Sequence, residues 1–370
     1  MKKIRVLHIV HNFLKGGIEG FLYYLCKKQK ENAFLDIHIL CCCDENKVVN
    51  KRILALGIPI HYVAIKPFDM RIRKYVQICN IANDFNIVHI HTFLPILCYS
   101  LAFSKAKILF TMHGAGSIRR DKNIKVKTKV FLLKWFLNNI ASGIAHNSLF
   151  TQKYWKQRGI TKCQYNEVVY NGVFFNECQN VSSVYADYPE LRNKKIIGTT
   201  CRMIPWKRVD LLVKSYIKAV SQLPLDWDLL IVGEGPELEK LKRISCKNEE
   251  ISKRIHFVGY KSNITDYQSA MDVCVFPSAE EPFGLVAIEC LHLGKPVYVM
   301  HDGGGLVEII KGISNEYIAN SIEDLAEKLI KFSRGDIWYN TEKAISFSNK
   351  FTIKHTEEGY YQMYKKLMKQ

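Results

Sequence analysis

Two glutamates, Glu281 and Glu289, stand eight positions apart around a Phe-Gly turn in the segment PSAEEPFGLVAIE, residues 277–289. An apolar run precedes this segment, and a helical pattern that ends at Gly-Lys-Pro follows it. A helix that begins near Gly284 directs free backbone N–H groups and the positive end of its dipole at an anion. Glycine lets that anion approach the main chain, and the two carboxylates can accept hydrogen bonds from sugar and ribose hydroxyls. The layout can therefore hold a sugar nucleotide.

A pair of cations follows another apolar run. Arg202 and Lys207 lie in TCRMIPWKR, residues 200–208. Two cations at the end of a strand can neutralise a diphosphate, and the alternative is a pair of solvated surface side chains.

The first half of the chain carries weaker signals. The turn at Gly16 and Gly17 follows the first apolar run, where a phosphate or sugar can approach the backbone. His113 ends the run 107–113, where a lone histidine is more often structural. His89 and His91 share one face of a strand by alternation; they could line a cleft, but buried, hydrogen-bonded side chains are expected. No zinc-like spacing occurs among the twelve cysteines, and we expect no metal site.

Strand-like and helical patterns alternate along the whole chain, which predicts parallel sheets covered on both faces. Two series of strands predict two doubly wound α/β domains, 1–180 and 181–350, with a polar linker over 176–195 and a C-terminal helix over 351–370. Ligands of such sheets lie beyond the carboxyl ends of the strands. The predicted strands are 4–10, 36–42, 58–63, 87–91, 107–113, 143–147 and 168–170, then 195–200, 227–232, 255–258, 273–276, 297–300 and 317–319.

These motifs together resemble one known family. The segment PSAEEPFGLVAIECLHLGKPV is similar to the E-x7-E signature of the retaining glycosyltransferases of family 4, of the bacterial surface-polysaccharide type. Further similar elements are GG-x-E at 16–19, Y-N-G-V at 170–173, G-x-G-P at 233–236 and the glycines 303–305 with Glu308. Two departures occur near the basic pair, because Cys201 and Arg208 stand where glycines are common.

The resemblance implies the GT-B fold, with two Rossmann-like domains facing a central cleft and a terminal helix that crosses back onto the first domain. It implies transfer of a hexose or N-acetylhexosamine from a nucleotide-diphosphate sugar, with UDP the expected nucleotide, and no metal or other cofactor. Arg202 and Lys207 would stabilise the diphosphate, and Glu281 and His113 would contact the donor sugar. The implied donor-binding residues are Gly16, Gly17, Gly259, Tyr260, Phe283, Gly284, Leu285, Val286 and Glu289. Retention favours a front-face mechanism, because no carboxylate is marked as a nucleophile.

The charge is uneven along the chain. Residues 1–185 carry 27 Lys and Arg against 10 Asp and Glu, whereas residues 186–370 carry 26 against 25. A basic first domain suggests an anionic partner: nucleic acid, anionic lipid or a phosphorylated acceptor. No helix-turn-helix, zinc or RNP-like pattern supports nucleic acid. The expected partner is a glycan or a polyprenyl-diphosphate-linked glycan.

A lysine-rich segment with Trp and Phe, residues 122–139, is consistent either with a membrane-interface helix or with a core helix behind a solvated loop. The uncharged stretch 85–104 contains two histidines, an asparagine and a proline, and it is better read as a buried strand and helix than as a bilayer span. No export signal is recognised, so the expected location is the cytoplasm, at the inner face of the membrane. Two other functions stay open: a different enzyme on the same architecture, such as a UDP-sugar 2-epimerase or a phosphorylase, and a basic nucleic-acid-binding protein.

Overall fold

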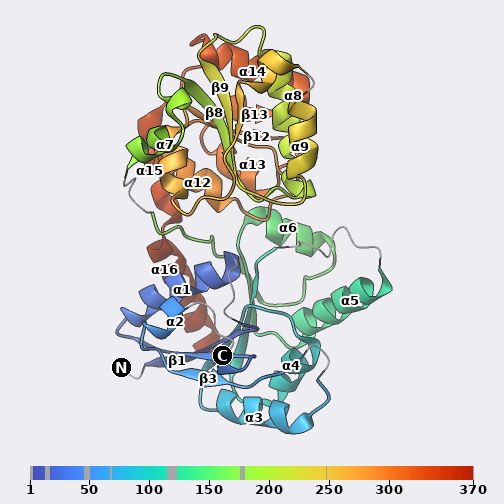
Figure 1. Ribbon diagram of the computed structural model, residues 1–370. Coiled ribbons are helices and arrows are strands. Elements are labelled where there is room, and N and C mark those ends of the chain that lie inside the picture. Colours follow the sequence, from blue (N-terminus) through green and yellow to red (C-terminus); the bar gives the residue numbers. More distant parts are fainter. Residues whose placement is uncertain are drawn as a thin grey trace. The chain divides into compact units, whose positions relative to one another are not determined.

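The computed structural model describes residues 3–12, 17–45, 51–66, 69–114, 123–175, 180–246 and 248–369. The chain divides into two compact units, which are drawn in Figure 1. The first unit comprises 1–174 together with 352–370, and the second comprises 175–351. The division after Phe174 differs from the boundary at 180 that the sequence suggested.

The first unit is built on a seven-stranded parallel sheet in the order β3-β2-β1-β4-β5-β6-β7. The chain starts in the middle of this sheet, runs to one edge and then returns to the other, which is the doubly wound pattern. The strands are β1 (Ile4–Val10), β2 (Leu35–Cys41), β3 (Ile60–Tyr62), β4 (Ile87–Ile90), β5 (Lys107–Met112), β6 (Gly143–His146) and β7 (Tyr165–Val168).

Helices cover both faces of this sheet, and α16 lies against α1 although the two are far apart in sequence (Figure 1). Strand alternation sorts the apolar side chains between two cores: Val6 packs on the side of α1 and α16, and Leu7 packs on the side of α3, α4 and α5. The helices are α1 (Gly17–Lys30), α2 (Lys51–Leu54), α3 (Ile72–Ala82), α4 (Pro95–Ser100), α5 (Ile124–Asn139), α6 (Leu149–Gln157) and α16 (Ile353–Met368).

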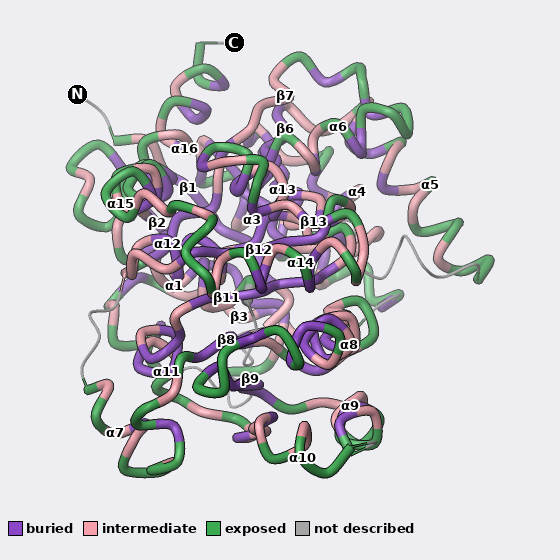
Figure 2. Tube along the Cα trace, turned by 90° about the horizontal axis from the view of Figure 1, so that it is seen from above, coloured by how far each residue is buried: buried purple, intermediate pink, exposed green. Residues whose placement is uncertain are grey.

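The second unit contains a six-stranded parallel sheet in the order β10-β9-β8-β11-β12-β13. Its strands are almost wholly buried, whereas the helices around them expose their outer faces (Figure 2). The strands are β8 (Lys195–Thr200), β9 (Trp227–Val232), β10 (Ile255–Phe257), β11 (Val273–Phe276), β12 (Val297–Met300) and β13 (Ile318–Ala319). The helices are α7 (Val181–Asp187), α8 (Val209–Ala219), α9 (Leu238–Ser245), α10 (Glu249–Ser252), α11 (Ile264–Ala270), α12 (Leu285–His292), α13 (Gly305–Lys311), α14 (Ile322–Ser333) and α15 (Thr341–Ser348).

The predicted α/β class with two parallel-sheet domains is confirmed, and most strands begin and end within two residues of the predicted bounds. The strand predicted at 168–170 is wrong in position, because β7 pairs through Tyr165–Val168 with β6. β7 is an edge strand whose residues are only half-buried and include Asn166 and Glu167, so its pattern is not apolar.

The predicted linker over 176–195 is also corrected. Residues 181–187 form helix α7, which packs on α11. The backbone N–H of Asn180 donates to Asp266 Oδ1 at 3.1 Å, next to the start of that helix. Since α7 buries only Val184, its sequence carries no helical periodicity that would distinguish it from a loop.

Candidate active site

The strand order of the second unit reverses between β8 and β11, which lie next to each other at the centre of the sheet. At such a point the loops that follow two neighbouring strands diverge, and the carboxyl edge of the sheet opens for a ligand. Arg202 and Lys207 follow β8, and Glu281 follows β11. The topology therefore brings the predicted cations and the first predicted carboxylate to the same edge.

An ion pair and a backbone hydrogen bond connect the loop after β8 to the loop after β11. Lys207 Nζ lies 2.6 Å from Glu281 Oε2, and both side chains are less than one-fifth exposed. The backbone N–H of Ala279 also donates to the carbonyl of Trp206 at 2.9 Å. The ion pair holds an ammonium and a carboxylate at one place, where the first can bind an anion and the second can accept hydrogen bonds from hydroxyls.

Arg208, the departure from the expected glycine, occupies a left-handed backbone conformation with φ of 48°. Only glycine adopts this conformation without strain, so an arginine there needs support. Its guanidinium provides that support. It forms a bidentate salt bridge with the carboxylate of Asp302, and its Nε donates a hydrogen bond to the carbonyl of Pro277 at 2.8 Å. Burial would raise the pKa of Asp302, but the hydrogen bonds from Arg208 lower it below the ordinary value. The ion pair and the hydrogen bond hold Arg208 in this left-handed conformation.

Arg202 has a different environment. Its side chain is exposed, and among the described residues its guanidinium makes no ion pair or hydrogen bond. The structure brings Lys207 and Glu281 together, and among the described residues neither forms an ion pair or hydrogen bond with Arg202.

Gly284 precedes the first turn of α12 and has φ of 112° and ψ of 54°. A methyl group at this position would overlap with the side chain of Leu306. The first turn contains the predicted Leu285 and Val286, whose N–H groups have no acceptor within the helix. The predicted Phe283 has a buried side chain, so only its backbone is available to a ligand.

The three glycines at 303–305 carry the neighbouring loop past Glu281. The N–H of Glu281 donates to the carbonyl of Gly303 at 3.0 Å, and the N–H of Gly305 donates to the carbonyl of Glu281 at 2.7 Å. A Cβ on Gly305 would overlap with the backbone of Pro282 and Phe283. These glycines are therefore needed to position the loop that carries the carboxylate.

Glu289 projects from α12 next to the end of β8. Gln268 Nε2 donates to Glu289 Oε2 at 3.3 Å and lies 3.3 Å from Thr200 Oγ1. Burial raises the pKa of the Glu289 carboxyl above its ordinary value, although the hydrogen bond from Gln268 lowers it. The predicted second carboxylate is thus oriented by a side chain, Gln268, that no sequence motif indicated.

The backbone at Gly259 and Tyr260 forms a tight turn after β10. Gly259 has φ of 68°, and its carbonyl accepts from the N–H of Gly233 at 2.8 Å. Glu234 Oε1 accepts from the N–H of Tyr260 at 3.2 Å, and the Tyr260 side chain is exposed. The exposed ring of Tyr260 is thus available to a planar ligand, with Glu234 beside it.

In the first unit, His113 follows β5. Its Nε2 lies 3.1 Å from His91 Nδ1, its ring makes an edge contact with Phe21, and its carbonyl accepts from Asn147. Burial lowers the pKa of His113 to about 4, so the ring is neutral near pH 7. Gly16 lies outside the described residues, and Gly17 is the first residue of α1.

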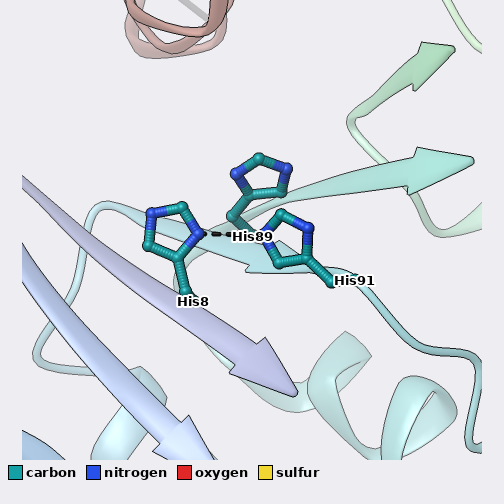
Figure 3. Close-up of side chains that lie close together, drawn as sticks. All are labelled: His8, His89 and His91. Atoms are coloured by element: carbon teal, nitrogen blue, oxygen red, sulfur yellow. Dashed lines mark hydrogen bonds between the residues drawn. The ribbon is translucent and has the colours of Figure 1, made fainter. Parts of the chain in front are cut away.

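Three further histidines lie on the same face of the sheet as His113. Figure 3 shows His8 of β1 next to His89 of β4 and His91, which follows β4. A ring nitrogen from each of His8, His89 and His91 lies within 4.8 Å of the others, which is a spacing compatible with a metal ion. However, every ring nitrogen of these three side chains is already engaged in a hydrogen bond within the protein. The arrangement is that of a hydrogen-bonded network, as expected for buried histidines.

A cavity of about 450 Å³ opens at the carboxyl ends of β1, β2 and β3. Its charged lining residues are Asp44, Lys66, Arg71 and Lys74, so cations outnumber carboxylates. Arg71 pairs with Asp69, and Lys74 Nζ donates to the carbonyl of Ala64. The sequence did not indicate this cavity, because its lining comes from short loops far apart in the chain.

Two family models match this chain, one in each unit. Residues 15–175 match the model "Glycosyltransferase Family 4", and residues 194–334 match "Glycosyl transferases group 1". The chain belongs to glycosyltransferase family 4. The lysine, the two glutamates and the glycine-initiated helix described above all lie within the second match.

Known proteins resemble the chain over most of its length. The N-acetyl-alpha-D-glucosaminyl L-malate synthase of Bacillus anthracis is 23% identical over 72% of this chain and 70% of that protein. The O-antigen biosynthesis glycosyltransferase WclY of Escherichia coli is 24% identical over 61% of this chain and 64% of WclY. The crystal structure of Anabaena Alr3699/HepE in complex with UDP covers 97% of this chain and 99% of HepE, with a TM-score of 0.78 and 18% identity. The predicted GT-B fold of this family 4 glycosyltransferase is confirmed.

Proposed function

We propose that this glycosyltransferase transfers a hexose or N-acetylhexosamine, with retention of anomeric configuration, from a UDP-sugar to a glycan acceptor in bacterial surface-polysaccharide assembly. Membership of family 4 and the relative WclY, a protein of O-antigen biosynthesis, support this assignment. The UDP in the HepE complex supports the choice of nucleotide. The observation that carries the proposal is the 2.6 Å pair of Lys207 and Glu281 at the point where the sheet order reverses.

The chemical task is to break the bond between the anomeric carbon and the diphosphate. Lys207, Arg202 and the N–H groups at the start of α12 stabilise the negative charge that grows on the diphosphate. Glu281 accepts hydrogen bonds from hydroxyls of the donor sugar, and its pairing with Lys207 keeps it close to the leaving group. Protein cations supply this stabilisation without a metal ion.

The remaining contacts to the donor follow the family pattern. Glu289, oriented by Gln268, accepts hydrogen bonds from the ribose hydroxyls. The turn at Gly259 and Tyr260 holds the base. The residues predicted in the first unit, His113, Gly16 and Gly17, are assigned to the donor sugar.

We assign a front-face mechanism to the transfer. The acceptor oxygen attacks on the side from which the diphosphate leaves, and its proton passes to a phosphate oxygen of the departing UDP. Glu281 is engaged by Lys207 and is assigned to binding, not to nucleophilic attack. An inverted linkage in the product, read by NMR, would contradict this assignment.

The acceptor is a polyprenyl-diphosphate-linked glycan or another anionic glycan. The excess of 17 positive charges over residues 1–185 favours an anionic acceptor. The cavity at the ends of β1 to β3 offers Lys66 and Lys74 to a phosphate or carboxylate of that acceptor.

Helix α5 is proposed as the contact with an anionic membrane. One face packs in the core through Leu133, Phe136 and Leu137. Ile124, Phe131 and Trp135 form a stripe on another face, with exposed fractions of 73%, 66% and 47%. Exposed Lys125 and Lys127 flank that stripe. Figures 1 and 2 show the N-terminal half of α5 lying away from the sheet of the first unit. Rings at the acyl boundary and lysines at the headgroups are the arrangement of an interfacial helix.

The membrane contact predicts a loss of vesicle binding on replacing the exposed rings. The double variant Phe131→Ser with Trp135→Ser is expected to bind phosphatidylglycerol-containing vesicles roughly tenfold more weakly, because two apolar side chains lose their burial. Sedimentation with vesicles measures this. The control is Trp338→Ser, an exposed tryptophan of the second unit, which should bind as the unaltered protein does. Equal binding of the α5 variant and the unaltered protein would rule out this surface.

In this proposal the protein attaches to the surface of the membrane through α5. Among the described residues, no helix is both long and apolar enough to cross a bilayer.

The function itself is tested by incubating the protein with a panel of UDP- and GDP-sugars and a lipid-diphosphate-linked glycan, and by measuring nucleotide release. We expect release of UDP that depends on the acceptor, together with a new glycosidic linkage in the product. Conversion of the UDP-sugar to its 2-epimer without acceptor would identify an epimerase instead. Retention on DNA without any affinity for UDP would favour a nucleic-acid-binding protein.

A further inference from the structure

A network of buried polar side chains lies between the sheet of the first unit and the helices α1 and α16. Strand alternation places its histidines on one face, since His8 pairs in register with His89 on the neighbouring strand. Figure 3 shows the contact between His8 and His91 within this network. Its members are His8, Gln29, His89, His91, Thr111, His113, Tyr360 and Tyr364.

Gln29 of α1 determines which group donates and which accepts in each hydrogen bond of the network. Its side chain is fully buried, with Oε1 at 2.8 Å from His8 Nε2 and Nε2 at 3.1 Å from the hydroxyl of Tyr364. An amide oxygen only accepts and an amide NH₂ only donates. His8 Nε2 must therefore carry a proton, and the Tyr364 oxygen must accept a hydrogen bond from the amide.

The first branch runs from Gln29 to His113. Burial lowers the pKa of His8 to about 4 and that of His91 well below its ordinary value, so both rings are neutral. A neutral His8 protonated on Nε2 has a lone pair on Nδ1, which accepts from His91 Nε2–H at 2.9 Å. By the same reasoning His91 Nδ1 accepts from His113 Nε2–H at 3.1 Å. His113 is then the Nε2–H tautomer, with a lone pair on Nδ1.

The second branch runs from Gln29 away from His113. Tyr364 accepts from the amide and so donates to His89 Nδ1 at 2.8 Å. His89 Nε2–H donates to Thr111 Oγ1 at 2.6 Å, and the Thr111 hydroxyl lies 3.1 Å from that of Tyr360. This branch ends in the core and makes no hydrogen bond to His113 among the described residues.

We propose that Gln29, His8 and His91 are positioning residues that fix His113 as its neutral Nε2–H tautomer, so that Nδ1 accepts a hydrogen bond from a hydroxyl of the donor sugar. The role of His113 toward the donor rests on the proposed function, whereas the tautomer rests on the network alone. Among the described residues, Nδ1 of His113 makes no hydrogen bond within the protein. Because Phe21 also packs against the ring, both its orientation and its tautomer are set by groups that do not touch the ligand.

The polarity of the whole branch depends on one amide. If the oxygen of Gln29 faced Tyr364 and its nitrogen faced His8, every proton in the first branch would move to the other ring nitrogen. His113 would then present an N–H at Nδ1 and would donate to a ligand. The two arrangements differ in an observable quantity, the protonation state of each ring nitrogen.

The tautomer is tested on the ligand-free, full-length protein labelled with ¹⁵N-histidine. Two-bond ¹H–¹⁵N correlations distinguish protonated from unprotonated ring nitrogens, and the His113 signals are assigned by their loss in His113→Asn. We expect His113 to be protonated on Nε2 and unprotonated on Nδ1 at pH 7. A proton on Nδ1, alone or together with one on Nε2, would overturn the proposal.

Two variants, one on strand β4 and one just after it, separate positioning from a merely structural role. His91→Phe removes the acceptor of His113 Nε2–H, and we expect a mixture of His113 tautomers and about a tenfold fall in kcat/KM. His89→Phe, equally buried but on the second branch, should leave the His113 signals in the Nε2–H form. Equal disturbance of His113 in both variants would show that the network is only packing.

A conservative variant keeps the test decisive if His91→Phe does not fold. In His91→Gln the amide NH₂ can donate to His8 Nδ1 and the amide oxygen can accept from His113 Nε2–H. This variant is therefore expected to keep His113 in the Nε2–H tautomer. Failure to restore it in a folded protein would contradict the relay. If no nucleotide sugar is turned over, the proposed function fails, yet the ligand-free NMR spectrum still decides the tautomer.

Discussion

Replacing Lys207 by methionine is expected to lower kcat for sugar transfer by about 10²- to 10³-fold, the usual effect of losing one well-aimed group that stabilises developing charge. Methionine keeps the length of the side chain and removes its charge. The change also leaves the largely buried carboxylate of Glu281 without its partner at 2.6 Å. KM for the donor is therefore expected to rise as well. Steady-state kinetics with the UDP-sugar that proves active measure both effects.

Lys214→Met is the matched control for this prediction. Lys214 pairs with Asp210 on helix α8 at 2.8 Å and carries the same charge, but it does not lie in the loop after β8. Its kcat should stay within about twofold, since an exposed pair of this kind contributes little. Lys207→Met and Glu281→Gln should be strongly non-additive, because the two side chains form one unit. Unchanged turnover in Lys207→Met would remove the assigned role of the pair.

Replacing Gly284 by alanine is expected to lower the free energy of unfolding by about 2–4 kcal/mol. The backbone there has φ of 112°, which L side chains rarely adopt, and the added methyl group would overlap with Leu306. Relief of the overlap must move the start of α12, and with it the N–H groups assigned to the diphosphate. The affinity for UDP should fall together with the stability, as urea unfolding and calorimetric titration would measure.

Gly20→Ala provides the opposite expectation within the same chain. Gly20 lies inside helix α1, and a Cβ there meets no atom within 4 Å. Alanine is favoured over glycine in a helix, so this variant should gain about 0.5–1 kcal/mol. Similar unfolding free energies for the two alanine variants would show that Gly284 is not constrained as its backbone indicates.

The sheets could be read from the sequence because strands buried on both faces are nearly continuous apolar runs. Strands β8, β9, β11 and β12 have the predicted bounds for this reason. The edge strand β7 was predicted at a shifted position, and the helix α7 was not predicted, since each buries few apolar side chains. The choice between a core helix and an interface helix for α5 could not be made from composition. The structure shows a buried face and an exposed apolar stripe on that one helix.

Much of the candidate site was also predictable, because phosphate- and sugar-binding turns need particular residue types next to strand ends. The spacing of Glu281 and Glu289 and the position of Lys207 indicated segments that the structure places after β8 and β11, at one edge of the sheet. No local pattern indicated Gln268, which orients Glu289 from another helix. Asp302, which supports the left-handed Arg208, is likewise a partner brought in from a distant loop. The histidine network was expected only as buried histidines, without Gln29 or the two tyrosines of α16.

The sequence by itself determined which elements form and which chemical groups stand at their ends, because burial patterns and glycine positions are local properties of the chain. The tertiary structure alone decided which of those groups meet: Lys207 with Glu281, Arg208 with Asp302, and Gln29 with His8. Each pair joins segments that lie from about twenty to about ninety residues apart, and no periodicity encodes such a contact. Strand order and the packing of helices on the sheet bring these partners within hydrogen-bonding distance, and the charge and protonation of the site follow from that.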